Sequence, residues 1–145
     1  MEKAIEKLMS VAPTQRLQIL EMARKHFPRG LEILIEWKSL GNEEVHPHEL
    51  CQALRTSRVE TVAEIKQSLP LQDLRAEDPQ IRFRAYRHME KHPEGFIIAL
   101  ATTGLGDKKR SIEDISRNLK MSPSVVKQTL HGLCHFINKT IAASD

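Results

Sequence analysis

The amino-acid sequence predicts an all-α fold with about eight or nine short helices and no β-sheet. Apolar residues recur at intervals of three and four positions, for example at Ile81, Ala85 and Met89, and this is the periodicity of an amphipathic helix. Nowhere do apolar and polar residues alternate over four or more positions, as they do in a half-buried strand. Proline and glycine residues separate the periodic segments and therefore mark the ends of the helices.

These helix-breaking positions place the elements in order along the chain. The breaks fall at Pro13, Phe27-Pro28-Arg29-Gly30, Gly41-Asn42, Leu69-Pro70, Asp78-Pro79, His92-Pro93, Gly104-Leu105-Gly106-Asp107 and Ser122-Pro123. The residues 70–79 between two of the breaks are expected to be a connection. The predicted helices are 2–11, 14–26, 29–40, 46–55, 58–69, 80–91, 93–103, 111–120 and 122–138.

The chain carries an internal repeat with a period of 65 residues. Without any gap, the shift superposes helix starts, glycine turns and core leucines, which are the positions where packing restricts the choice of residue. This predicts two tandem tri-helical units, although two unrelated helical hairpins could align in the same way. The superposed residues are Pro28, Gly30, Ile33, Leu40, Gly41, Leu54 and Ser57 with Pro93, Gly95, Ile98, Leu105, Gly106, Leu119 and Ser122.

Length and composition exclude several classes of protein. The 145 residues are 40% hydrophobic and 28% charged, which is typical of a globular domain and not of a disordered tail. No run approaches the ~20 apolar residues of a membrane-spanning helix, and the charged first residues do not resemble a signal peptide. Two cysteines make no disulfide framework, so we expect a reducing, cytoplasmic environment and no membrane.

The charge is uneven along the chain. Residues 1–70 hold 10 Lys and Arg against 10 Asp and Glu, whereas residues 71–145 hold 12 against 9. Within 79–139 the balance is 11 against 5, a net charge of +6. Such an excess predicts an anionic partner, most commonly nucleic acid. A helical surface that is merely basic and solvated would show the same balance.

The segment 111–130 contains the most informative motif. Ser111 and Asp114 have the spacing of a capping box at a helix start, and Ser122 caps a second helix that Pro123 opens. In the first helix, Ile112, Ile115 and Leu119 form an apolar face, and Ser116 is small where the second helix must approach. The second helix buries Val126, Leu130 and Leu133. Two helices joined by about three residues in this way form a helix-turn-helix.

The pattern Ile115-Ser116, Leu119, the run from Ser122 to Lys127, and Leu130 resembles the tri-helical helix-turn-helix of sigma-factor region four and LuxR-type regulators. The resemblance covers about twenty residues. Lys120 stands where that superfamily usually has glycine in the turn, and Val125 where threonine is common. The acidic and aromatic residues that precede the LuxR-type motif are missing.

This resemblance implies that the helix starting at Ser122 enters the major groove of double-stranded DNA. Gln128 would pair with adenine, Lys127 would reach guanine or phosphate, and Val125 would touch a thymine methyl group. The residues expected near the bases are Ser122, Ser124, Val125, Lys127, Gln128 and His131. The residues expected at the phosphates are Lys108, Lys109, Arg110, Arg117, Lys120, Arg84, Arg87 and Lys91.

The first repeat shares the core and turn residues of the second repeat but lacks its DNA-facing residues. Glu60 and Glu64 stand where the second repeat has Val125 and Thr129, and carboxylates are repelled by phosphates. We therefore assign 1–70 to protein contacts, either with a second subunit or with the transcription machinery, and 71–145 to DNA binding. The alternative is that Arg55 and Arg58 support a weaker half-site. Trp37, Ile33 and Ile35 are expected in the core.

Metal and catalytic functions have little support in the sequence. Histidines recur four apart, with Cys134 beside one pair, but no Cys-x-x-Cys or His-Glu-x-x-His is present, so no metal is expected. No phosphate loop or nucleophile motif is present, and we expect neither an enzyme nor a cofactor. The sequence thus predicts a DNA-binding transcriptional regulator, bacterial or phage- or plasmid-encoded, acting as a dimer or a pseudo-symmetric tandem. The alternative is an all-helical adaptor for RNA polymerase, a sigma factor or a secretion component.

Overall fold

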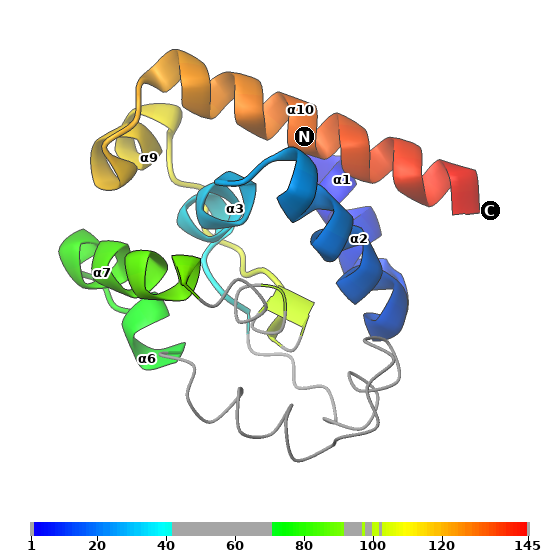
Figure 1. The fold of residues 1–145 in the computed structure, drawn as a ribbon, viewed down its shortest axis with the longest axis horizontal. Coiled ribbons are helices and arrows are strands. Elements are labelled where there is room, and N and C mark those ends of the chain that lie inside the picture. The colour runs from blue at the N-terminus through cyan, green and yellow to red at the C-terminus, as the bar shows by residue number, and fades with distance from the viewer. Residues whose placement is uncertain (1, 42–70, 92–96, 98–99, 102, 145) are drawn as a thin grey trace.

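The computed structural model describes residues 2–41, 71–91, 97, 100–101 and 103–144 (Figure 1). In this part of the chain there are seven named helices and no strand, which confirms the all-α prediction. The predicted helices 46–55 and 58–69, with Glu60, Glu64, Arg55 and Arg58, lie outside the described residues. The helices are α1 (Glu2–Ser10), α2 (Pro13–His26), α3 (Gly30–Lys38), α6 (Leu71–Leu74), α7 (Pro79–Glu90), α9 (Ile112–Leu119) and α10 (Pro123–Ser144).

Several helix boundaries differ from those predicted. Helix α3 ends two residues early, because Ser39 takes a positive φ of 65° and its N–H closes the helix on Ile35 O. Helix α10 continues past residue 138 to Ser144, because Ile141 extends its apolar stripe against the core. The expected connection 70–79 contains the short helix α6. Asp78 caps α7 by accepting a hydrogen bond from Gln80 N at 2.9 Å.

The long helix α10 lies along one edge of the molecule and packs on α1, α2, α3 and α9 (Figure 1). Helix α1 crosses beneath it, and α9 lies at its N-terminal end (Figure 1). Residues from both predicted halves therefore enter one apolar core, for example Leu8 of α1, Leu34 of α3 and Leu130 of α10. Helix α3 is the centre of this core, with every residue from Gly30 to Lys38 buried, and the core positions predicted for Ile33, Ile35 and Trp37 are confirmed.

The C-terminus of α3 is closed by the segment that leads into α9. The last carbonyls of a helix have no partner within it. Here the N–H groups of Lys108 and Arg110 donate to Lys38 O at 3.2 Å and to Trp37 O at 3.0 Å. The backbone of residues 106–110 is thereby fixed to α3, and with it the start of α9.

A small antiparallel bridge joins Leu40 to Leu105. Gly41 N donates to Gly104 O at 2.9 Å, and Gly106 N donates to Ser39 O at 2.8 Å. Both Ser39 and Gly104 have positive φ angles, of 65° and 70°. A Cβ atom at Gly41 would lie 2.5 Å from Thr103 O, so this crossing requires glycine. The two segments therefore bind each other reciprocally, each donating from a glycine to the turn of the other.

None of the helices in the described ranges combines the length and the apolar character needed to cross a membrane.

Candidate nucleic-acid interface

Both helices of the predicted motif begin with the expected caps. Ser111 Oγ accepts a hydrogen bond from Asp114 N at 3.1 Å, which fixes the start of α9. Ser122 Oγ accepts from Val125 N at 3.3 Å at the start of α10. Each serine satisfies an N–H that has no partner inside its helix, and the start of each helix is therefore set by the sequence.

The turn between α9 and α10 consists of residues 120–122 and depends on Lys120. This residue adopts the left-handed conformation, with φ 56° and ψ 45°. The helix-turn-helix superfamily that this motif resembles usually has glycine at the equivalent position. The conformation costs a non-glycine residue about 1–2 kcal/mol. Ser116 O accepts hydrogen bonds from the N–H groups of Lys120 and Met121, and Ser116 Oγ donates to Met121 O. The small buried Ser116 thus closes the turn from both its backbone and its side chain.

The first turns of α10 present one polar face to solvent. Val126, Leu130 and Leu133 are buried against the rest of the molecule, as predicted. Val125 has 44% of its surface exposed and is one of only two large apolar residues at that level in the described part of the chain. The predicted base-contacting residues are all exposed: Ser122, Ser124, Val125, Lys127, Gln128 and His131.

A group of cations gathers around Phe83, where α7 meets α9. The Lys120 Nζ lies 5.0 Å from the centre of the Phe83 ring, and the Arg87 Cζ lies 5.8 Å from it, so one half-buried ring orients both cations. Phe83 also lines a cavity of about 510 Å³ together with Arg84, Arg117 and Lys120. We call the exposed cations of α7, of α9 and of the residue that follows each helix the basic patch: Arg84, Arg87, Lys91, Arg117 and Lys120.

Arg117 of the basic patch already has an anionic partner. Its Nη2 pairs with Asp114 Oδ1 one turn earlier on α9. Both side chains are largely exposed, so this pair contributes little to stability, and a phosphate can replace the carboxylate at small cost.

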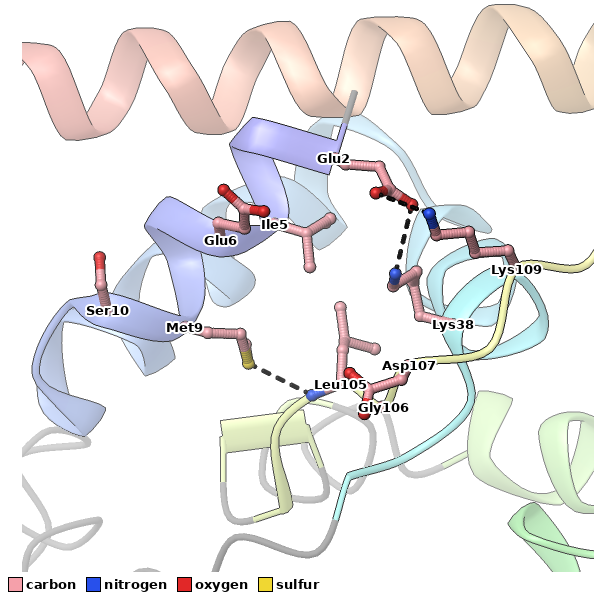
Figure 2. A pocket seen from close by; sticks show the side chains of 10 residues that line it. All are labelled: Glu2, Ile5, Glu6, Met9, Ser10, Lys38, Leu105, Gly106, Asp107 and Lys109. Atoms are coloured by element: carbon pink, nitrogen blue, oxygen red, sulfur yellow. Dashed lines mark hydrogen bonds and ion pairs between the residues drawn. The ribbon is translucent and has the colours of Figure 1, made fainter.

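The other three predicted phosphate contacts occupy different surroundings. Lys109 pairs with Glu2 of α1 at 3.2 Å and lines a separate cavity with Lys38 (Figure 2). Arg110 is half-buried, and its Nη1 donates to Glu36 O at 2.8 Å, where it helps to close the C-terminus of α3. Lys108 is exposed. The role of Arg110 in the fold was not predicted from the sequence.

A buried charge cluster that was not predicted from the sequence joins α3, α7 and α9. Glu36 accepts hydrogen bonds from Arg82 at 2.7 and 3.0 Å, from Tyr86 Oη, and from Asn118 Nδ2 at 3.1 Å. Although burial raises the pKa of Glu36, the hydrogen bonds from Arg82 and Tyr86 outweigh it and hold the pKa below its ordinary value. The carboxylate therefore stays ionised and holds α9 in position.

A second buried carboxylate lies beneath the end of α9. Glu32 pairs with Arg29 at 3.0 Å, and Arg29 Nη2 also donates to Leu119 O at 3.4 Å. Burial raises the pKa of Glu32 to about 7; Arg29 lowers it and Glu90 raises it further. Glu32 therefore changes charge near neutral pH, next to the turn that precedes α10.

This raised pKa predicts a pH dependence of stability. The unfolded chain releases the Glu32 proton near pH 4.5, whereas the folded chain holds it up to about pH 7. The free energy of unfolding should therefore fall as the pH rises through this window, by about 1.4 kcal/mol for each unit of pKa difference. In Glu32→Gln that fall should be absent, as measured by urea unfolding across the window. An identical fall in the variant would contradict the assignment.

Histidine and cysteine side chains do not converge in the described part of the chain. Cys134 of α10 is buried, whereas His131 and His135 are exposed. Burial also raises the pKa of the Cys134 thiol. Among the described residues, no three His, Cys, Asp or Glu side chains gather as metal ligands would.

Comparison of this chain with protein-family models, with curated proteins and with solved structures finds no match.

Proposed function

We propose that this chain is a transcriptional regulator that binds double-stranded DNA and inserts the first turns of α10 into the major groove. One observation carries the proposal: α10 exposes a polar face at the end where α9 and its three-residue turn support it. A helix held in this way, with its N-terminal residues free, has the geometry with which helix-turn-helix proteins meet base edges.

The exposed residues of α10 supply different kinds of base contact. Gln128 offers an amide that pairs with adenine through one donor and one acceptor, and Lys127 donates to guanine or to phosphate. Val125 offers an exposed apolar surface for a thymine methyl group. Ser124 and His131 are exposed on the same helix and are the remaining base-facing residues of α10.

The basic patch supplies the contacts to the phosphates. Lys120 and Arg87 both lie over the Phe83 ring, and Arg84 and Arg117 line the same cavity, where α7 packs on α9. Adding Lys127 gives six exposed cations: Arg84, Arg87, Lys91, Arg117, Lys120 and Lys127. These contacts fix the position of the protein on the duplex but do not distinguish sequences.

The proposal includes the tandem duplication of a tri-helical unit. The bridge between Leu40 and Leu105 supports it, because these two residues are equivalent under the 65-residue shift. The two hydrogen bonds from Gly41 and Gly106 are likewise equivalent, and so are the positive φ angles of Ser39 and Gly104. Such reciprocal pairing is what an approximate twofold axis between two copies produces. The N-terminal half is assigned to contacts with a second subunit or the transcription machinery.

Retention of labelled DNA by the purified chain tests this function. A pool of random duplexes should be retained, successive rounds should enrich one sequence, and retention should fall steeply with added salt as the basic patch loses its phosphates. Failure to retain duplexes at low salt would reject DNA binding and favour the adaptor function. The enriched sequence also reports symmetry, because a dimer or a tandem would select two half-sites.

A further inference from the structure

A separate cavity lies between α1, the end of α3 and residues 105–109 (Figure 2). Its volume is about 510 Å³, within the ~300–1,000 Å³ range of pockets that hold small ligands. It shares no residue with the cavities beside Phe83. Nothing in the proposed DNA-binding function uses its interior.

Two ammonium groups converge in this cavity on a single carboxylate (Figure 2). Lys38 Nζ lies 3.4 Å from Glu2 Oε1, and Lys109 Nζ lies 3.2 Å from Glu2 Oε2. The lysines come from different elements, and the side chain of Lys38 is only 10% exposed. Glu2 stands at the start of α1, so its carboxylate can leave without disturbing the core. The Glu2 carboxylate thus occupies the place that a ligand's carboxylate would take.

The remaining walls of the cavity are apolar on one side and acidic on the other. Ile5, Met9 and Leu105 form the apolar wall, and Leu105 N donates to Met9 Sδ at 3.3 Å, which fixes two of its members. Glu6 and Asp107 also line the cavity and form no ion pair within the described part of the chain.

The balance of charge in the cavity selects the ligand class. Once Glu2 has left the two lysines, the lining holds Lys38 and Lys109 against Glu6 and Asp107, so a purely anionic ligand would turn an even balance into a negative excess. A ligand with both a carboxylate and an ammonium group adds no net charge, and its ammonium can pair with Glu6 or Asp107, which form no ion pair with another described residue. An apolar part attached to the carbon chain that carries the two charged groups would cover the wall of Ile5, Met9 and Leu105.

We propose that this cavity binds a small zwitterion with an apolar frame, of the kind represented by a free amino acid. Its carboxylate displaces Glu2 from Lys38 and Lys109, its ammonium group faces Asp107 or Glu6, and its apolar part packs against α1 and Leu105. Bound there, the ligand contacts the segment that leads directly into α9.

Calorimetry on the full chain, without DNA, tests this proposal. The probes are leucine and ε-aminocaproate, with isocaproate and isoamylamine as analogues that each lack one of the two charges. At least one zwitterion should bind, and both single-charge analogues should bind about tenfold more weakly, because each loses a charge-assisted hydrogen bond. Equal binding of an analogue, or no binding of either zwitterion, would overturn the proposal.

Three variants locate the site. Lys109→Gln should weaken binding of the zwitterion about tenfold, whereas Glu2→Gln should tighten it about 2- to 5-fold by removing the internal competitor. Lys3→Gln is the matched control, since Lys3 lies on α1, is exposed and does not line the cavity. If Lys109→Gln behaves like Lys3→Gln, the zwitterion does not bind here. Because no DNA is present, these outcomes are independent of the proposed regulatory function.

Discussion

Replacing Arg82 with methionine should lower the free energy of unfolding by about 3 kcal/mol. Arg82 is buried and forms two hydrogen bonds with the Glu36 carboxylate, and its Nη1 also donates to Ala76 O and Glu77 O. Methionine fills similar space but leaves the carboxylate, among the described residues, with only Tyr86 and Asn118 as side-chain donors. An ionised carboxylate that loses its charged partner inside a protein is strongly unfavourable.

Urea unfolding of the wild type and the variant measures this effect. Arg84→Met is the matched control, because Arg84 lies on the same helix but is exposed, and it should change stability by no more than about 0.5 kcal/mol. A loss in Arg82→Met that equals the loss in the control would show that the cluster around Glu36 does not hold α7 and α9 together.

Replacing both Lys127 and Gln128 with alanine should weaken binding to the selected DNA sequence by about 1–3 kcal/mol for each hydrogen-bonded base that the variant no longer reaches. Both side chains are exposed on the free face of α10, and alanine is a good helix former. The melting temperature should therefore stay close to that of the wild type. Binding to unrelated duplexes should weaken less, because only Lys127 is charged and most phosphate contacts remain in the basic patch.

The comparison of selected and unrelated duplexes separates reading of bases from general attraction. Lys139→Ala together with His135→Ala is the matched control, since both residues are exposed on the same helix but lie nearer its C-terminal end. This control should bind the selected sequence as tightly as the wild type. If the Lys127 and Gln128 variant also retains full specific affinity, α10 does not read the DNA.

The helices and their caps were predictable from the sequence because they depend on local signals. Ser111, Ser122 and Pro123 act through the backbone of their own helices, and their spacing alone fixes where α9 and α10 begin. The buried stripe of α10 followed from its apolar periodicity, whereas its base-facing residues were implied by the resemblance to the helix-turn-helix. The left-handed conformation of Lys120 was not predicted, because the sequence shows only that a lysine stands where the helix-turn-helix motif usually has glycine.

What escaped prediction depends on contacts between residues far apart in the chain. Glu36 lies between Ile35 and Trp37 in a largely apolar helix, which signals a buried acid, but its partners Arg82 and Asn118 come from 46 and 82 residues away. Arg110 is predicted to contact phosphate because it adjoins Lys108 and Lys109. In the structure its Nη1 donates instead to Glu36 O near the end of α3. A charge pattern cannot distinguish a cation facing solvent from one facing a helix terminus.

The salt dependence of DNA binding tests the central claim most directly. If α10 enters the groove while the six exposed cations of α7, α9 and α10 contact phosphates, the logarithm of the binding constant should fall with the logarithm of salt concentration at a slope of about −4 to −6. Replacing Arg87 and Lys120 with glutamine should reduce the steepness by about 2. A binding constant that does not change with salt would contradict the account.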